Sequence, residues 1–224
     1  MAAARDTSDD KLSGNAPGES SQTHSRDPKR NRRLLVQATL DSVAEDGITD
    51  TTVSAIIKRA GLSRGMIHLH FGGKDGLLVA AAEAFSDCYF EEMQRQLARA
   101  GDTPEAVITA VIRADLSPEI MNERAVAIWH GFRGESRTNT AIARYSDTRD
   151  MRLRETIFRA FLALLDGDSH TANEVTLGTL AMMEGMWTDY LTHPDRFSRD
   201  TAVRIIMRFL GGVVPGHFRI DPQT

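Results

Sequence analysis

The sequence predicts an all-α protein in which a small N-terminal head of three helices precedes a larger helical body. Of its 224 residues 41% are hydrophobic but only 6% are aromatic, so the chain can bury a core through aliphatic side chains. Apolar residues recur with helical spacing, most cleanly at Val53, Ile56, Ile57 and Ala60. Strand patterns are nearly absent, with GVVPGHFRI near the C-terminus as the single weak exception. These observations together indicate helices packed on helices.

Turn and capping residues divide the head into three short helices. Gly47 is expected to end the first helix, and either Thr51 or Thr52 can cap the second. Gly61 ends the second helix, Ser63 caps the third, and a double glycine stops it. The helices expected in the head are 29–46, 53–60 and 64–71.

The body is expected to consist of longer helices. Lys74 opens a helix that runs to about Ala100, and Pro104 stands in the first turn of the next one. Further helices are expected over 118–135, 138–166, 170–192 and 198–212. The predicted divisions are a Ser- and Asp-rich disordered tail 1–27, the three-helix head 28–76, the helical body 77–215, and a short tail 216–224.

Composition narrows the class of protein. Cys88 is the only cysteine, so neither an intrachain disulfide nor a zinc site built from cysteines is possible. The first residues lack the apolar core of a signal peptide, and no uncharged apolar run approaches the roughly 18 residues that span a bilayer. We therefore expect a cytoplasmic protein that has no membrane partner and no cofactor.

Charge is distributed unevenly along the chain. The net charge is −4, yet residues 28–80 carry eight Lys or Arg and five Asp or Glu, which leaves +3 there and −7 elsewhere. A mildly basic head on an acidic body concentrates the attraction for phosphate at one end of the molecule. The charge pattern is consistent with nucleic-acid binding by the head.

Two short helices joined by a tight glycine turn, with a supporting helix before them, are the parts of a helix-turn-helix. At about 100° per residue, Ile67 and Phe71 share one face of the third helix. Gly65, Met66 and Leu69 then lie on the opposite face, which is expected to enter the major groove. There the two apolar side chains can contact thymine methyl groups.

Polar residues around this helix are expected to fix it on the duplex. Arg64 can read a guanine, His68 and His70 can reach the phosphates on either side, and the helix starts at Thr52 and Lys74 can bind phosphate. Basic residues that form either an N-terminal arm or the first turn of the first helix add backbone or minor-groove contacts. The predicted DNA-binding residues are Arg30, Arg32, Arg33, Thr52, Ser63, Arg64, Gly65, Met66, His68, Leu69, His70 and Lys74.

The segment AGLSRGMIHLHFGGKDGLL resembles the helix-turn-helix of the TetR family of transcriptional regulators. Matches to the family pattern fall at Ala60, Gly61, Leu62, Ser63, Gly65, Ile67, Phe71, Lys74, Leu77 and Leu78. The chain departs from the pattern at His68 and His70, where the family usually has aromatic residues. The resemblance implies a homodimer whose last two long helices pair with their twofold mates. It also implies a repressor that a small molecule releases from a pseudo-palindromic operator.

A narrower resemblance is to the BetI-type repressors within this family. It is carried by the end of the helix-turn-helix, by Ala127-Ile128-Trp129 followed by Phe132, and by Glu184-Gly185-Met186-Trp187. Repressors of this type respond to choline, so the resemblance implies choline or a related ammonium compound as the effector.

Two aromatic pairs at helical spacing suggest where such an effector could bind. Trp129 and Phe132 are three residues apart on one expected helix, and Trp187 and Tyr190 repeat the spacing on another, with Glu184 one turn earlier. If the helices face each other, these residues form an aromatic cage for an organic cation. The alternative is that both tryptophans simply fill the core.

Other functional classes were weighed against this interpretation. The helices at 52–74 could be a hairpin within a core, but such a hairpin would not leave apolar side chains free opposite its buried stripe. His68 and His70 point to opposite sides of a helix, which argues against a shared metal ion. The remaining alternatives are a small-molecule-binding helical enzyme and an adaptor that does not bind DNA. The sequence contains no G-x-S-x-G, no glycine-rich phosphate loop and no H-E-x-x-H.

Overall fold

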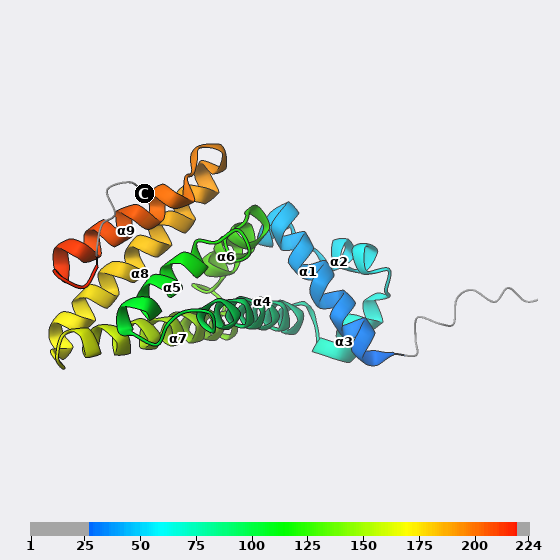
Figure 1. Cartoon of the computed structure of the whole chain (residues 1–224). Coiled ribbons are helices and arrows are strands. Elements are labelled where there is room, and N and C mark those ends of the chain that lie inside the picture. Colours follow the sequence, from blue (N-terminus) through cyan, green and yellow to red (C-terminus); the bar gives the residue numbers. More distant parts are fainter. Residues whose placement is uncertain (1–26, 219–224) are drawn as a thin grey trace, which may run out of the picture.

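The computed structural model describes residues 27–218, and every regular element within them is helical. The three helices of the head lie at one end of an elongated molecule, and α4 leads from them into the body (Figure 1). The elements are α1 (Pro28–Asp50), α2 (Val53–Ala60), α3 (Arg64–Phe71), α4 (Lys74–Leu97), α5 (Pro104–Asp115), α6 (Glu123–Glu135), α7 (Thr140–Leu164), α8 (Ser169–Thr192), the 3-10 turn η1 (Pro194–Arg196) and α9 (Arg199–Val213). The expected all-α fold is confirmed. The tail predicted at 1–27 lies almost entirely outside the described residues, as does the end of the tail predicted at 216–224.

Local signals explain the helix-turn-helix geometry of the head. The Thr52 hydroxyl accepts a hydrogen bond from the Ala55 amide and caps α2. Gly61 ends α2 in the left-handed conformation, with φ 65°, which is open to glycine at little cost. Ile56 and Ile67 then meet in the head core, where both are fully buried. The turn is therefore set by one cap, one glycine and one apolar contact.

The first helix is longer than its predicted end at Gly47. The backbone leaves helical geometry at this glycine, with φ 78° and ψ 161°, and one further turn continues to Asp50. At the other end, the Asp27 carboxylate accepts a hydrogen bond from the Arg30 amide and caps the helix. The basic residues predicted as an arm or first turn are therefore part of α1 itself.

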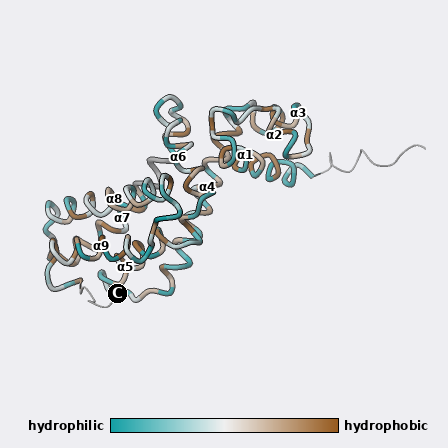
Figure 2. Tube along the Cα trace, turned by 90° about the horizontal axis from the view of Figure 1, so that it is seen from above, coloured by the Kyte–Doolittle hydropathy of each residue, from teal (hydrophilic) through white to brown (hydrophobic). Residues whose placement is uncertain are grey.

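The body is built from α4–α9 around one large apolar core, with hydrophobic residues recurring along the helices of both parts of the molecule (Figure 2). Within residues 27–218 no helix is long and apolar enough to cross a membrane.

Two sequence expectations need correction. Residues 118–122 form turns, and α6 begins at Glu123 because Asn122 caps it through the Ala125 amide. The weak strand signal falls on the end of α9 and the turns that follow it.

The head joins the body through α6, which packs extensively against α1, and through α4, which packs against both α1 and α3. Ile128 and Phe132 of α6 are buried together with Leu40 and Val43 of α1. A Cβ at Gly131 would stand 3.0 Å from Val43 Cγ1, so this glycine permits the close approach of the two helices.

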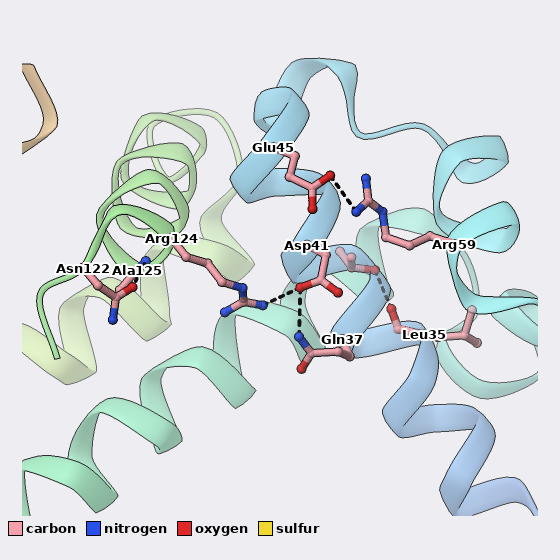
Figure 3. A network of polar contacts seen from close by, with 9 residues as sticks. Leu35, Gln37, Asp41, Glu45, Arg59, Asn122, Arg124 and Ala125 are labelled. Carbon is pink, nitrogen blue, oxygen red and sulfur yellow. Dashed lines mark hydrogen bonds and ion pairs between the residues drawn. The ribbon is translucent and has the colours of Figure 1, made fainter. Parts of the chain in front are cut away.

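Polar contacts reinforce the joint (Figure 3). Asp41 on α1 accepts hydrogen bonds from Gln37, at 2.9 Å, and from Arg124 of α6, at 2.7 Å. One turn further along α1, Arg59 of α2 pairs with Glu45 at 2.8 Å, and this hydrogen bond raises the pKa of the Arg59 guanidinium. The first helix therefore links the helix-turn-helix to the body.

Candidate DNA interface and effector site

The third helix presents a free face, as its sequence predicts. Ile67 is buried in the head core, whereas Leu69 is 74% exposed. Gly65 and His68 are also exposed, and the nearest atom to a Cβ built at Gly65 would be Ser63 Oγ at 3.8 Å. A large apolar side chain and a glycine thus lie on the outside of a short helix, where a DNA base can approach both.

Met66 does not share this free face. Its side chain is half-buried and packs against the head core together with Phe71. The sequence predicts Met66 beside Leu69 on the free face, but Met66 lies near the edge of the buried stripe and the head core partly covers it. Leu69 is therefore more exposed on the outside of α3 than Met66 is.

Two residues predicted to contact phosphate, Arg32 and His70, make contacts within the head. The Arg32 guanidinium donates a 3.3 Å hydrogen bond to the carbonyl of His70 and stacks over the Phe71 ring, 4.6 Å from its centroid. His70 is half-buried, and its Nε2 is inaccessible to solvent. Arg32 therefore holds the end of α3 against α1, and the His70 ring does not project freely from the helix flank.

The remaining predicted residues lie at the surface around α3. Thr52 and Ser63 stand at the starts of α2 and α3, and the Ser63 hydroxyl makes no capping bond. Lys74 opens α4 and is partly exposed. The exposed side chains of Arg30 and Arg33 line one wall of a groove of about 630 Å³ between α1 and α4, and Arg64 is exposed at the first position of α3.

The junction between α3 and α4 depends on Gly76. A Cβ at this position would lie 2.0 Å from the carbonyl oxygen of Phe71, a separation that requires the backbone to move. The first turn of α4 can thus pack directly on the last turn of α3. This close approach fixes the angle between the exposed helix and the long helix that leads into the body.

Inside the body, the two tryptophans form one unit. Trp129 of α6 and Trp187 of α8 meet edge to face, with ring centroids 6.4 Å apart and planes at 70°. Each indole Nε1 donates a hydrogen bond to a carboxylate: Trp129 to Glu184 at 3.3 Å, and Trp187 to Asp115 at 2.9 Å. Both rings are almost fully buried. The aromatic pair is therefore held between two acidic side chains.

The inner carboxylate, Asp115, stands at the end of α5 and is 1% exposed. Its second oxygen accepts a 2.6 Å hydrogen bond from the Tyr89 hydroxyl of α4. Both Asp115 oxygens are thereby oriented by aromatic side chains from two other helices. A buried carboxyl group whose two oxygens both accept hydrogen bonds is a satisfied polar group within an otherwise apolar core.

The outer carboxylate, Glu184, lies closer to solvent. Besides Trp129, it contacts Arg133 of α6, whose Nε is 3.5 Å from Glu184 Oε1. The Arg133 guanidinium also lies over the Trp129 ring, 5.1 Å from its centroid. A cation thus already contacts the aromatic pair on the side that faces solvent.

The cage expected from the sequence is only partly assembled. Trp129, Trp187 and Glu184 come together, but Phe132, about 60° from Trp129 round the axis of α6, packs in the joint with α1. Tyr190 stacks edge to face on Phe197, with centroids 5.3 Å apart, and Arg199 lies over its ring. Phe132 and Tyr190 are therefore removed from the predicted site.

Sequence reasoning missed Asp115 and Tyr89. Asp115 ends an apolar helix, a position at which an acidic residue is usually solvated. Its only sequence signal is that both flanking positions, Ala114 and Leu116, are apolar and buried. Tyr89 lies within the buried stripe of α4 and looks like an ordinary core residue until its hydroxyl is traced to Asp115.

A helix-turn-helix head joined to a larger helical body is the architecture of a DNA-binding transcriptional regulator. Residues 35–81 match the family of bacterial regulatory proteins of the tetR type, and residues 104–215 match the C-terminal domain of BetI-type transcriptional repressors. The chain belongs to the TetR family of transcriptional regulators, with a BetI-type C-terminal domain.

Individual relatives agree with this assignment. The chain is 31% identical over 179 residues to the HTH-type transcriptional regulator BetI of Stenotrophomonas maltophilia, covering 80% of this chain and 90% of that protein. It is 30% identical over 171 residues to BetI 1 of Chromohalobacter salexigens, covering 76% and 84%. These similarities extend across both the head and the body.

Solved structures share the fold. A transcriptional regulator from Pseudomonas aeruginosa PAO1 superposes with a TM-score of 0.78 at 24% identity, covering 88% of this chain and 99% of that one. A regulator from Saccharomonospora viridis, crystallised in complex with choline, gives a TM-score of 0.69 at 20% identity, covering 81% and 96%.

Proposed function

We propose that this protein is a homodimeric repressor that binds a pseudo-palindromic operator through α3 and is released by an organic cation of the choline class. The observation that carries the ligand half of the proposal is the Trp129–Trp187 pair held between the carboxylates of Asp115 and Glu184. The head (28–76) reads DNA, and the body (77–215) binds the effector and dimerises. A regulator of this kind acts in the cytoplasm, where bacterial chromosomal DNA lies, and the proposal includes no catalytic step.

On DNA, the exposed face of α3 would enter the major groove with Leu69 against thymine methyl groups and Gly65 close to the bases. The starts of α2 and α4 would receive phosphates, because Thr52 and Lys74 add a hydroxyl and a charge to unsatisfied backbone amides. Arg30, Arg33, Arg64 and His68 would supply further contacts at the surface of the duplex. If four of these residues touch phosphate in each subunit, affinity should fall by orders of magnitude between low and physiological salt.

In the body, the quaternary ammonium group would lie against the faces of Trp129 and Trp187. Each desolvated aromatic face contributes about 0.5–2 kcal/mol to the binding of such a cation. The inner carboxylate of Asp115, held in place by Tyr89, would supply the opposing charge. A choline complex of a regulator with the same fold supports this ligand class.

Helix α6 provides a direct connection from this site to the head. Trp129 lies on the side of α6 that faces α8, whereas Ile128 and Phe132 lie on the side that packs against α1. A ligand that moves the Trp129 side of α6 would therefore change how α1 sits on the body. Tilting both heads of a dimer would alter the spacing between the two α3 helices, and operator half-sites tolerate little change in that spacing.

The dimer would form through α8 and α9. Four large hydrophobic side chains on these two helices are 40–46% exposed: Leu177, Leu191, Ile205 and Val213. Apolar side chains exposed along two adjacent helices favour association with a second copy, and a twofold pairing of α8 and α9 would bury them in a four-helix arrangement.

The proposal is tested first by binding. Electrophoretic shift of the DNA upstream of the protein's own gene should occur with the specific sequence and be absent with a scrambled one. Lys74→Ala should weaken binding to all sequences alike and reduce the salt dependence. Calorimetric titration should detect binding of choline but not of its uncharged isostere 3,3-dimethylbutanol. Equal binding of the isostere would contradict the cation site, and loss of sequence preference would contradict the DNA-binding role.

A further inference from the structure

Arg133 already makes the two contacts that an organic cation would make at the outer half of the effector site. Its guanidinium carbon lies 5.1 Å from the centroid of the Trp129 ring, and its Nε lies 3.5 Å from Glu184 Oε1. An aromatic face and a carboxylate are the two groups that recognise a quaternary ammonium ion. The guanidinium therefore occupies part of the space in which the effector would gain its binding energy.

We propose that Arg133 is a built-in competitor of the effector, so that the ligand binds only by displacing its guanidinium from Trp129 and Glu184. This inference rests on the proposed function, because it assumes a cationic effector. The Arg133 side chain is 41% exposed and that of Glu184 is 36% exposed. The long, flexible arginine can thus swing into solvent without opening the buried core that holds Trp187 and Asp115.

Competition of this kind sets the concentration at which the regulator responds. When a site is free for only one-tenth of the time, the apparent affinity for its ligand falls about tenfold. A neutral ligand cannot take over the contacts of the guanidinium, because neither Trp129 nor Glu184 attracts an uncharged group as strongly. Arg133 therefore favours charged effectors and raises the concentration of effector needed for release.

Displacement of Arg133 would also remove an ion pair between α6 and α8. Arg133 and Trp129 of α6 both contact Glu184 of α8. Phe132 and Ile128, about 60° and 100° round the axis of α6 from Trp129, are packed with α1. Removal of the guanidinium from Glu184 would leave the Trp129–Glu184 hydrogen bond between α6 and α8, so that α6 is held less tightly to α8 while its contact with the head remains.

The test is calorimetric titration of the intact dimer with choline chloride. Arg133→Gln removes the competing charge and should tighten choline binding about tenfold. Arg133→Lys keeps a positive charge at this position and should remain close to the wild type. The matched control is Arg159→Gln on α7, which removes the same charge from an exposed ion pair with Glu155 and should leave the affinity unchanged.

The outcomes separate the two proposals. If the wild type binds choline and Arg133→Gln binds it equally or more weakly, the competitor role is overturned and the cation site stands. Equal tightening by Arg133→Gln and Arg133→Lys would also overturn it, because charge would then not be the cause. If neither the wild type nor Arg133→Gln binds choline, both proposals fail.

Discussion

The Nε1 of Trp187 donates a 2.9 Å hydrogen bond to Asp115, a carboxylate that is 1% exposed at the end of α5. This pair joins an aromatic ring to a buried carboxyl group, and Tyr89 donates a hydrogen bond to the second oxygen of the same group. The arrangement distinguishes the interior of this body from an ordinary apolar core, in which such groups are seldom buried.

Asp115→Asn should weaken choline binding by at least about tenfold, or about 1.4 kcal/mol, because the amide keeps the shape of the side chain and loses its charge. Calorimetry on the purified variant measures the change, and circular dichroism verifies that the helical fold is retained. Trp187→Phe should weaken binding less, since an aromatic face remains. Unchanged choline affinity in Asp115→Asn would remove this carboxylate from the site.

Leu69→Ala should cost about 1–3 kcal/mol of binding free energy on the operator and little on unrelated DNA. The reason is that Leu69 is 74% exposed in the free protein and has a partner only when a base edge is present. Fluorescence anisotropy with labelled duplexes gives both affinities. The melting temperature serves as control, because the side chain contributes little to the head core. A large drop in melting temperature would mean that Leu69 is a packing residue.

Gly76→Ala should destabilise the protein by about 1–3 kcal/mol, because the new methyl group would collide with the Phe71 carbonyl. Gly134→Ala in α6 is the matched control. A Cβ there meets nothing within 4 Å, so alanine should be neutral or stabilise the helix by up to about 1 kcal/mol. Urea denaturation of both variants measures the difference. Similar stabilities would show that the junction of α3 and α4 is not constrained as described.

Ile205→Glu should convert the dimer to a monomer, because it would place two carboxylates in the interface proposed for α8 and α9. Ile205 is 46% exposed in the single chain, so the monomer itself should remain folded. Light scattering should give twice the chain mass of 24.7 kDa for the wild type and the single mass for the variant. Met151→Glu, at a 68% exposed position of α7, is the control and should remain dimeric. A dimeric Ile205→Glu would contradict this interface.

The head was predictable from sequence because its signals are local. The cap at Thr52, the turn at Gly61 and the apolar spacing that ends at Ile67 act within a few residues, and the structure has each as expected. Errors arise where the outcome depends on a neighbouring helix. Met66 lies at the edge of the buried stripe, and Arg32 reaches from α1 to the end of α3, which no pattern within α3 indicates.

The proposed effector site was less predictable because its residues come from four helices. Trp129 and Phe132 are three residues apart, which rotates them by about 60° around the helix axis. Because α6 lies between α1 and α8, this rotation places Phe132 in the contact with α1 and Trp129 in the contact with Trp187. The apolar neighbours of Asp115 are too weak a signal to predict its role, because its burial depends on how α4 and α8 close over the end of α5.

The central claim, that an organic cation in the body releases the head from DNA, is tested most directly by operator affinity at increasing choline concentration. Anisotropy of a labelled operator duplex should show the apparent affinity of the dimer falling as choline saturates the site, with no change from 3,3-dimethylbutanol. Asp115→Asn should bind the operator as the wild type does and remain bound at choline concentrations that release the wild type. Operator affinity that stays constant while calorimetry shows the choline site to be full would contradict the account.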